Sequence, residues 1–197
     1  MKSNLRRSFE FILLTLALPM ALAAQQPARM RLHLDPAATE IHYTLKDTLH
    51  TVRGTFHMKS GDIDFNTQTG EAKGLIEVET SSGVSGNDSR DGKMKRDYLE
   101  VPKFPVATFE AQKVTGFSSA PGAQKVTVAG VFTLHGGSHP LTLEFAVTHD
   151  GALVNATTSF KIPYVAWGIK DPSIPFVRVE KEVAVDIVAK GNLQTVP

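Results

Sequence analysis

Most of this chain alternates apolar and polar residues with the period of two that is typical of a β-strand with one buried face. The alternating segments are short, and turn residues separate them, as in Asn66–Gly70 (NTQTG). No regular alternation of strands with helices accompanies them, so a parallel α/β sheet is not expected. About eight such strands predict an antiparallel sandwich or an up-and-down barrel. The segments are Thr39–Lys46, Leu49–His57, Gly61–Phe65, Gly74–Thr80, Val106–Val114, Lys125–Leu134, Pro140–Thr148, Leu153–Phe160 and Lys181–Ala189.

The inward faces of the predicted strands are apolar and partly aromatic. A closed eight-stranded barrel can enclose one small ligand, but a filled core explains the same faces, and the pattern alone favours the filled core. Trp167, in a proline-rich loop, can either pack on a ligand at the barrel rim or anchor the loop. For a hollow barrel, the residues predicted to line the cavity are Phe56, Phe65, Ile76, Val78, Leu99, Phe109, Phe132, Leu143, Phe145, Phe160 and Trp167.

One stretch breaks the alternation and predicts a short helix over residues 87–99. Asn87 can cap this helix with its side-chain oxygen, and Met94 and Tyr98 lie one helical turn apart. Pro102 prevents the helix from continuing. A short helix among strands must cover either an end or an edge of the sheet, and we expect this one to cover the mouth of a barrel.

Acidic and basic residues are interleaved along this helix, a pattern that favours an exposed surface with salt bridges. Arg96, Asp97 and Tyr98 are nevertheless the residues predicted to lie at the mouth and to meet a ligand head group. The reason is that a guanidinium group offers a directional set of donors to an anionic or carbonyl group.

The first 24 residues are typical of a secretory signal peptide. Arg6 and Arg7 contribute to a basic start, Phe11–Leu18 is an apolar run too short to span a bilayer, and Ala21–Ala23 resembles a cleavage site. Residues 25–197 then form a single domain, which we expect in the periplasm without a stable membrane anchor. Both the general secretory route and the twin-arginine route remain open.

Composition and motifs exclude several classes of protein. The chain has no cysteine, so disulfides, thiolate metal sites and a cysteine nucleophile are excluded. Loss of residues 1–24, which hold three bases and one acid, lowers the formal net charge from +1 to −1, which argues against a nucleic-acid partner. His135 and His139 flank a glycine turn, but a zinc or copper site needs three or four convergent ligands. The sequence therefore predicts no metal, no cofactor and no catalytic residue.

Three longer stretches carry motifs that recur together in one known family. They are His50–Asn66 (HTVRGTFHMKSGDIDFN), Lys95–Phe109 (KRDYLEVPKFPVATF) and Val128–Leu143 (VAGVFTLHGGSHPLTL). Together they resemble the YceI-like family of lipocalin-like, polyisoprenoid-binding proteins. The resemblance implies an eight-stranded antiparallel barrel around an elongated apolar cavity, a bound isoprenoid-type lipid and, in many members, a periplasmic location. Many members carry Arg-x-Asp-Phe-Gly where Tyr164–Gly168 (YVAWG) stands here, which leaves the head-group preference open.

Taken together, the sequence predicts an all-β, eight-stranded antiparallel lipocalin-like barrel with a short helical insertion near residues 87–99. We expect a periplasmic binding or carrier protein for an apolar, chain-like lipid of isoprenoid type, acting as a monomer or a homodimer. Two alternatives remain: an enzyme acting on an apolar substrate in the barrel, and an extracytoplasmic stress or interaction protein with a filled barrel. The enzyme candidates are His42, Tyr43, His50 and Asp97, which no known catalytic spacing connects.

Overall fold

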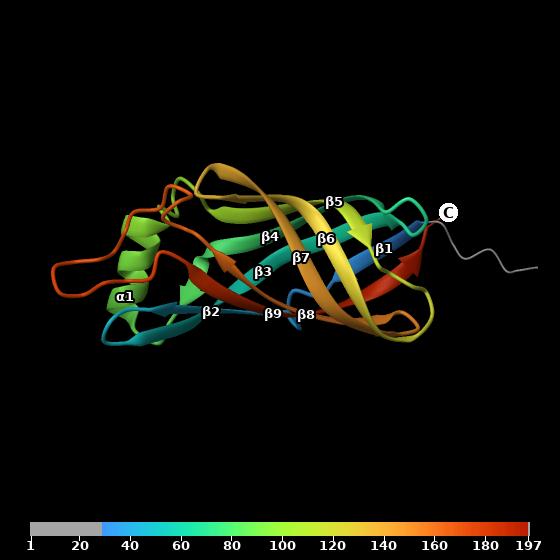
Figure 1. Ribbon diagram of the computed structural model, residues 1–197, viewed down its shortest axis with the longest axis horizontal. Helices are drawn as coiled ribbons and strands as arrows, with labels where there is room; N and C mark the ends of the chain where they lie inside the picture. Colours follow the sequence, from blue (N-terminus) through green and yellow to red (C-terminus); the bar gives the residue numbers. More distant parts are fainter. Residues whose placement is uncertain (1–28, 197) are drawn as a thin grey trace, which may run out of the picture.

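Nine antiparallel strands form one sheet that closes on itself, as Figure 1 shows for the computed structural model of the chain. The structure describes residues 29–196, so the predicted signal peptide of residues 1–24 lies outside the described residues. Hydrogen bonding between the third and fourth strands closes the ring. The strands are Arg29–Leu34 (β1), Glu40–Lys46 (β2), Thr51–Asn66 (β3), Glu71–Val84 (β4), Val106–Thr115 (β5), Gly122–Leu134 (β6), Gly137–Asp150 (β7), Leu153–Ile162 (β8) and Val183–Thr195 (β9).

β1 and β2 share one position in the barrel. β1 pairs with the second halves of β3 and β9, and β2 pairs with the first halves of the same two strands. Between them, Pro36 has no amide hydrogen for the ladder, and the carboxylate of Asp35 accepts the amide of Ala37 at 2.9 Å. Because β1 and β2 together occupy one place in the ring, the nine strands form an eight-stranded barrel. The predicted eight-stranded antiparallel fold is therefore confirmed.

β3 and β1 differ most from the predicted strands. β3 runs unbroken through Met58–Ser60, which separated the predicted strands Leu49–His57 and Gly61–Phe65; a β-bulge against β4 lies here instead. β1 was not predicted. Its outward side chains Arg31 and His33 lie beside Asp64 and Asp62 of β3, at 2.5 Å and 2.8 Å.

The predicted helix is present between β4 and β5. It begins as an α-helix, Asp88–Lys93 (α1), and continues as a π-helical turn, Met94–Tyr98 (η1). The side chain of Asn87 accepts the amide of Arg90 at 2.9 Å, which is the N-cap bond expected of asparagine. Figure 1 shows α1 at one end of the elongated barrel and the C-terminal end of β9 at the opposite end. Within residues 29–196, no helix is long and apolar enough to cross a membrane.

The loop between β8 and β9, residues 163–182, lies at the same end as α1 (Figure 1). Its backbone pairs with the turn between β2 and β3. The amide of Thr48 donates to the carbonyl of Arg178 at 3.0 Å, and the amide of Glu180 donates to the carbonyl of Lys46 at 2.9 Å. The helix and this loop therefore lie at the same end of the barrel, where both are placed to cover its opening.

Candidate functional site

The barrel interior is hollow, whereas the strand pattern alone favoured a filled core. It holds an inner chamber of about 150 Å³ and, beneath α1 and η1, a helix-end chamber of about 430 Å³. Six residues line both chambers, so the two chambers adjoin at a shared wall, which we call the waist. The waist residues are Ile41, Val78, Ala107, Phe132, Phe160 and Ile187.

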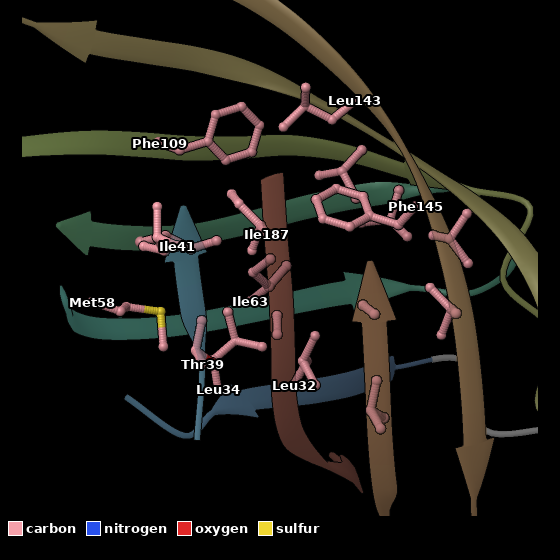
Figure 2. A pocket seen from close by; sticks show the side chains of 18 of the residues that line it. Leu32, Leu34, Thr39, Ile41, Met58, Ile63, Phe109, Leu143, Phe145 and Ile187 are labelled. Carbon is pink, nitrogen blue, oxygen red and sulfur yellow. The ribbon is translucent and has the colours of Figure 1, made fainter. Parts of the chain in front are cut away.

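The inner chamber is lined almost entirely by hydrocarbon. Figure 2 shows Leu34 of β1, Phe109 of β5 and Phe145 of β7 directed into the same space. Among residues 29–196, Thr39 and Thr108 are the only lining residues with a side-chain oxygen or nitrogen. A cavity of this size and polarity stays dry and accepts apolar guests. This chamber can therefore hold a hydrocarbon chain by burial, without any directional contact.

Two buried tyrosines, Tyr43 and Tyr164, line the helix-end chamber. The hydroxyl of Tyr43 donates to the sulfur of Met94 at 3.7 Å, and the hydroxyl of Tyr164 donates to the carbonyl of Glu180 at 2.7 Å. Burial raises the pKa of Tyr43 above its usual range. Burial, with the charge of Asp171 as a second cause, raises the pKa of Tyr164 to about 12. Both phenols stay protonated at neutral pH and act as hydrogen-bond donors. Tyr43 donates to the helical segment of α1 and η1, which we call the cover, and Tyr164 donates to the β8–β9 loop.

Four charged residues line the helix-end chamber, and we call them the charged rim: Lys46, Asp47, Arg90 and Lys93. The carboxylate of Asp47 accepts two backbone amides of the following turn at 2.7 Å each, and these bonds hold its pKa below the usual range. The guanidinium of Arg90 donates to the hydroxyl and the carbonyl of Ser85 at 2.7 Å and 2.9 Å. Among the described residues, neither Lys46 nor Lys93 forms an ion pair. The rim therefore presents a surplus of positive charge to the chamber.

Polar contacts fix the helical cover to the barrel on both sides. Asp91 is buried and accepts the amide of Ser85 at 2.9 Å as well as the Ser85 hydroxyl. Burial alone would raise the pKa of Asp91, but the hydrogen bonds from Ser85 and the charges of Arg90 and Lys95 together outweigh it, and the pKa lies below its usual range. After the helix, Oε2 of Glu100 lies 2.8 Å from Nε2 of His135 in the β6–β7 turn. Asp91 thus ties α1 to the residue that follows β4, and Glu100 lies within ion-pair distance of the β6–β7 turn.

The structure brings most of the predicted cavity residues together around one space. Their role in binding a ligand remains a prediction. Phe65, Ile76, Phe109, Leu143 and Phe145 line the inner chamber; Val78, Phe132 and Phe160 belong to the waist; Phe56, Tyr98 and Leu99 line the helix-end chamber.

Arg96 and Asp97 do not line either chamber, in contrast to the predicted mouth position. Nε of Arg96 lies 2.8 Å from Oδ1 of Asp97, and the side chain of Arg96 is 71% exposed. The cause is the π-helical turn, in which the amide of Leu99 donates to the carbonyl of Met94, five residues earlier. Met94 and Tyr98 at the two ends of this turn line the chamber, whereas Arg96 and Asp97 between them form an ion pair with each other.

Trp167 also lies outside the lining of the two chambers. Its ring stacks on His139, with centroids 4.1 Å apart and an interplanar angle of 4°, and lies 5.9 Å from the ring of Phe132. Trp167 therefore packs behind a waist residue, and its role in contacting a ligand stays a prediction.

The histidines and the enzyme candidates are not brought together. His135 contacts Glu100 and His139 stacks on Trp167, so these two turn histidines have separate partners. Among residues 29–196, no group of three or more His, Asp or Glu residues is placed to hold a metal ion. Of the enzyme candidates, only Tyr43 lines the cavity; His42 lies next to it on the opposite, exposed face of β2.

The sequence missed the charged rim and the contribution of the β8–β9 loop. Tyr43 was detectable, because its alternation with Ile41 and Leu45 places it on the inward face of β2. Lys46 ends that strand, and no local pattern distinguishes it from other exposed lysines. The loop supplies Tyr164, Ile169, Pro172 and Val179 to the helix-end chamber.

Comparison with known sequences gives one family and several relatives. The YceI-like domain profile matches residues 32–190. A UPF0312 protein of Vibrio parahaemolyticus is 33% identical over 95 residues, which are 47% of this chain and 48% of that protein. The chain thus spans about half the length of this relative. A UPF0312 protein of Pseudomonas putida is 27% identical over 145 residues, which are 68% of this chain and 72% of that protein.

Solved structures show the same fold at low sequence identity. A polyisoprenoid-binding domain from Saccharophagus degradans superposes with a TM-score of 0.67 at 17% identity, over 86% of this chain and all of that domain. BcnA of Burkholderia cenocepacia superposes with a TM-score of 0.66 at 19% identity, over 80% of this chain and 98% of that protein.

Proposed function

This chain belongs to the YceI-like domain family, and from that premise we propose that it binds one apolar, chain-like lipid of isoprenoid type and carries or sequesters it in the periplasm. The observation that carries the proposal is the pair of adjoining chambers inside the barrel, an apolar inner chamber and the helix-end chamber, which share the waist residues. The description of the Saccharophagus degradans relative as a polyisoprenoid-binding domain supports the same ligand class.

Burial supplies the affinity in this proposal. Each methylene group removed from water contributes about 0.8 kcal/mol, so a long chain gains strongly in a dry cavity. The cavity is divided by a waist, and a flexible unbranched or isoprenoid chain can pass such a constriction more readily than a rigid ring system. The proposal needs neither a metal nor a cofactor.

The charged rim gives the ligand an orientation. The tail extends into the inner chamber, where hydrocarbon surrounds it, and the head group remains at Lys46 and Lys93. Because the two ammonium groups have no carboxylate partner among the described residues, an anionic head group gains more there than a neutral one. This refines the predicted head-group position, which rested on Arg96 and Asp97.

The location follows from the leader sequence. Residues 1–24 have a basic start, a short apolar run and small residues before Gln25. Mass analysis of exported protein should show a mature start near Ala24 or Gln25. Intact Met1 on periplasmic protein would contradict this part of the proposal.

Native mass spectrometry followed by solvent extraction tests the binding function. Protein purified without added lipid should carry one lipid adduct per chain, and the extracted material should be an isoprenoid-type lipid. Empty protein that converts an apolar substrate would support the enzyme instead. Empty protein that also takes up no added isoprenoid would contradict the proposal and favour the stress or interaction protein.

A further inference from the structure

The loop between β8 and β9 ends in an apolar tip that projects from the barrel. The tip is Ile174–Val177, and its two ends exchange backbone hydrogen bonds of 3.0 Å and 3.1 Å. Ile174 is 61% exposed and Phe176 is 97% exposed. In Figure 1 this orange-red loop extends beyond α1 at the helix end of the barrel.

Phe176 is an unfavourable residue for this turn. Its φ of 71° lies in the left-handed region, and Pro175 precedes it. Glycine or asparagine usually occupies such a position, because a larger side chain crowds the backbone there. The exposed ring gains nothing from packing within the fold that would offset this strain. A strained residue that makes no stabilising contact within its own fold suggests a functional contact with another molecule.

The tip lies beside the helix-end chamber. Val179 forms a β-bridge with Asp47, and both residues line that chamber. The turn that contains Asp47 also carries Leu49, which is 68% exposed. Large apolar side chains from two neighbouring segments are therefore presented to solvent at the end of the barrel where the charged rim lies.

The charges around the tip are predominantly positive after pairing. Asp171 pairs with Lys181, and Glu182 pairs with Lys161 at 3.2 Å. Among the described residues, Lys46, Lys170 and Arg178 have no ion-pair partner near the tip. The neighbouring acids are Glu180, which has none either, and Asp47, whose one ion-pair contact is Nδ1 of His50 at 3.7 Å. Positive charge around exposed apolar side chains matches the interface of an anionic phospholipid membrane.

We propose that Ile174, Phe176 and Leu49 insert into the surface of an anionic phospholipid membrane and hold the cavity mouth against it. The inference rests on the proposed lipid-binding function, because an apolar cargo must leave and enter a lipid phase. A narrow tip with a fully exposed aromatic ring suits insertion between head groups better than docking on a flat protein surface.

The test uses the double variant Ile174→Ser with Phe176→Asn. Asparagine tolerates positive φ, so the turn and the fold should be retained. The control is Leu153→Ser, which removes a side chain of similar exposure, 63%, from the first residue of β8. Two quantities are measured for the mature protein: binding to phosphatidylcholine vesicles containing about 25% phosphatidylglycerol, and the rate at which a preloaded fluorescent isoprenoid passes to them.

We expect the tip variant to bind these vesicles about tenfold more weakly than the wild type, because it loses apolar area that the membrane buries. It should also transfer the isoprenoid to them about tenfold more slowly. Its loading with isoprenoid in solution and its thermal stability should not change, and Leu153→Ser should behave as the wild type. Equal vesicle binding and transfer by wild type and tip variant would overturn the membrane tip while leaving the binding function intact. A wild type that binds vesicles but never loads isoprenoid would instead overturn the proposed function.

Discussion

The hydroxyl of Tyr43 donates a hydrogen bond to the sulfur of Met94 at 3.7 Å, which joins the inner wall of β2 to the helical segment above it. Met94 begins the π-helical turn and also lines the helix-end chamber. This contact couples the cover to the cavity wall. A change in the cover should therefore alter the rate at which a ligand exchanges.

Leu99→Asp should open the cover. Leu99 lines the helix-end chamber, and an unpaired carboxylate against apolar surface is costly. A bound fluorescent isoprenoid should therefore leave faster, and hydrogen exchange should increase over residues 87–109 while the strands remain protected. Ser89→Asp, at an exposed position of α1, is the matched control. Equal release rates for the two variants would show that the helix is not a cover.

Ala107→Phe should separate the two chambers. Ala107 is a buried waist residue, and the larger ring fills the passage at a cost of about 1–3 kcal/mol in folding free energy. Long isoprenoids should lose affinity, whereas chains short enough for the helix-end chamber should bind as before. Ala146→Phe, on the exposed face of β7, is the control, and circular dichroism checks the fold of both variants. Equal losses for short and long chains would contradict a continuous cavity.

Lys46→Gln combined with Lys93→Gln should weaken binding of an isoprenyl phosphate but leave binding of the neutral isoprenol unchanged. Exposed charge contacts contribute roughly 1 kcal/mol each at most, so the expected loss for the phosphate is about tenfold, and it should diminish in high salt. Lys113→Gln, on the exposed face of β5, controls for the loss of charge. Identical losses for phosphate and alcohol would place the head group elsewhere.

Acid should weaken the attachment of the cover through Asp91. The folded protein lowers the pKa of this carboxyl below 3.8, so the ionised form stabilises the fold. That stabilisation is complete above the usual pKa and is lost as the pH falls through the lowered value. Asp91→Asn should therefore reduce the free energy of unfolding by about 1 kcal/mol at neutral pH, and the difference from wild type should shrink as the pH falls below about 4. A difference that is constant with pH would contradict a role for the charge.

The sequence predicted those features that depend on local pattern. Period-two alternation placed Phe109 and Phe132 on inward faces, and both line the cavity. Asn87 and Pro102 bounded the helix, because capping and termination are properties of single residues.

The features that the sequence did not predict depend on residues far apart in the chain. β1 is fixed by pairing with strands about thirty or more residues away, including the contact of Arg31 with Asp64. The charged rim combines Lys46 of β2 with Lys93 of α1, and no local pattern places these two residues around one opening. The local sequence did not predict the π-helical turn either, and this turn directs Arg96 and Asp97 away from the chamber.

The most direct measurement of the central claim is photo-crosslinking with an isoprenyl phosphate that carries a diazirine at the far end of its tail. If the barrel holds the lipid tail-first, peptides that contain Phe109 and Phe145 of the inner chamber should be labelled, and excess unlabelled lipid should abolish the labelling. Labelling confined to the outer surface or to the charged rim, or labelling that excess lipid does not reduce, would contradict the account.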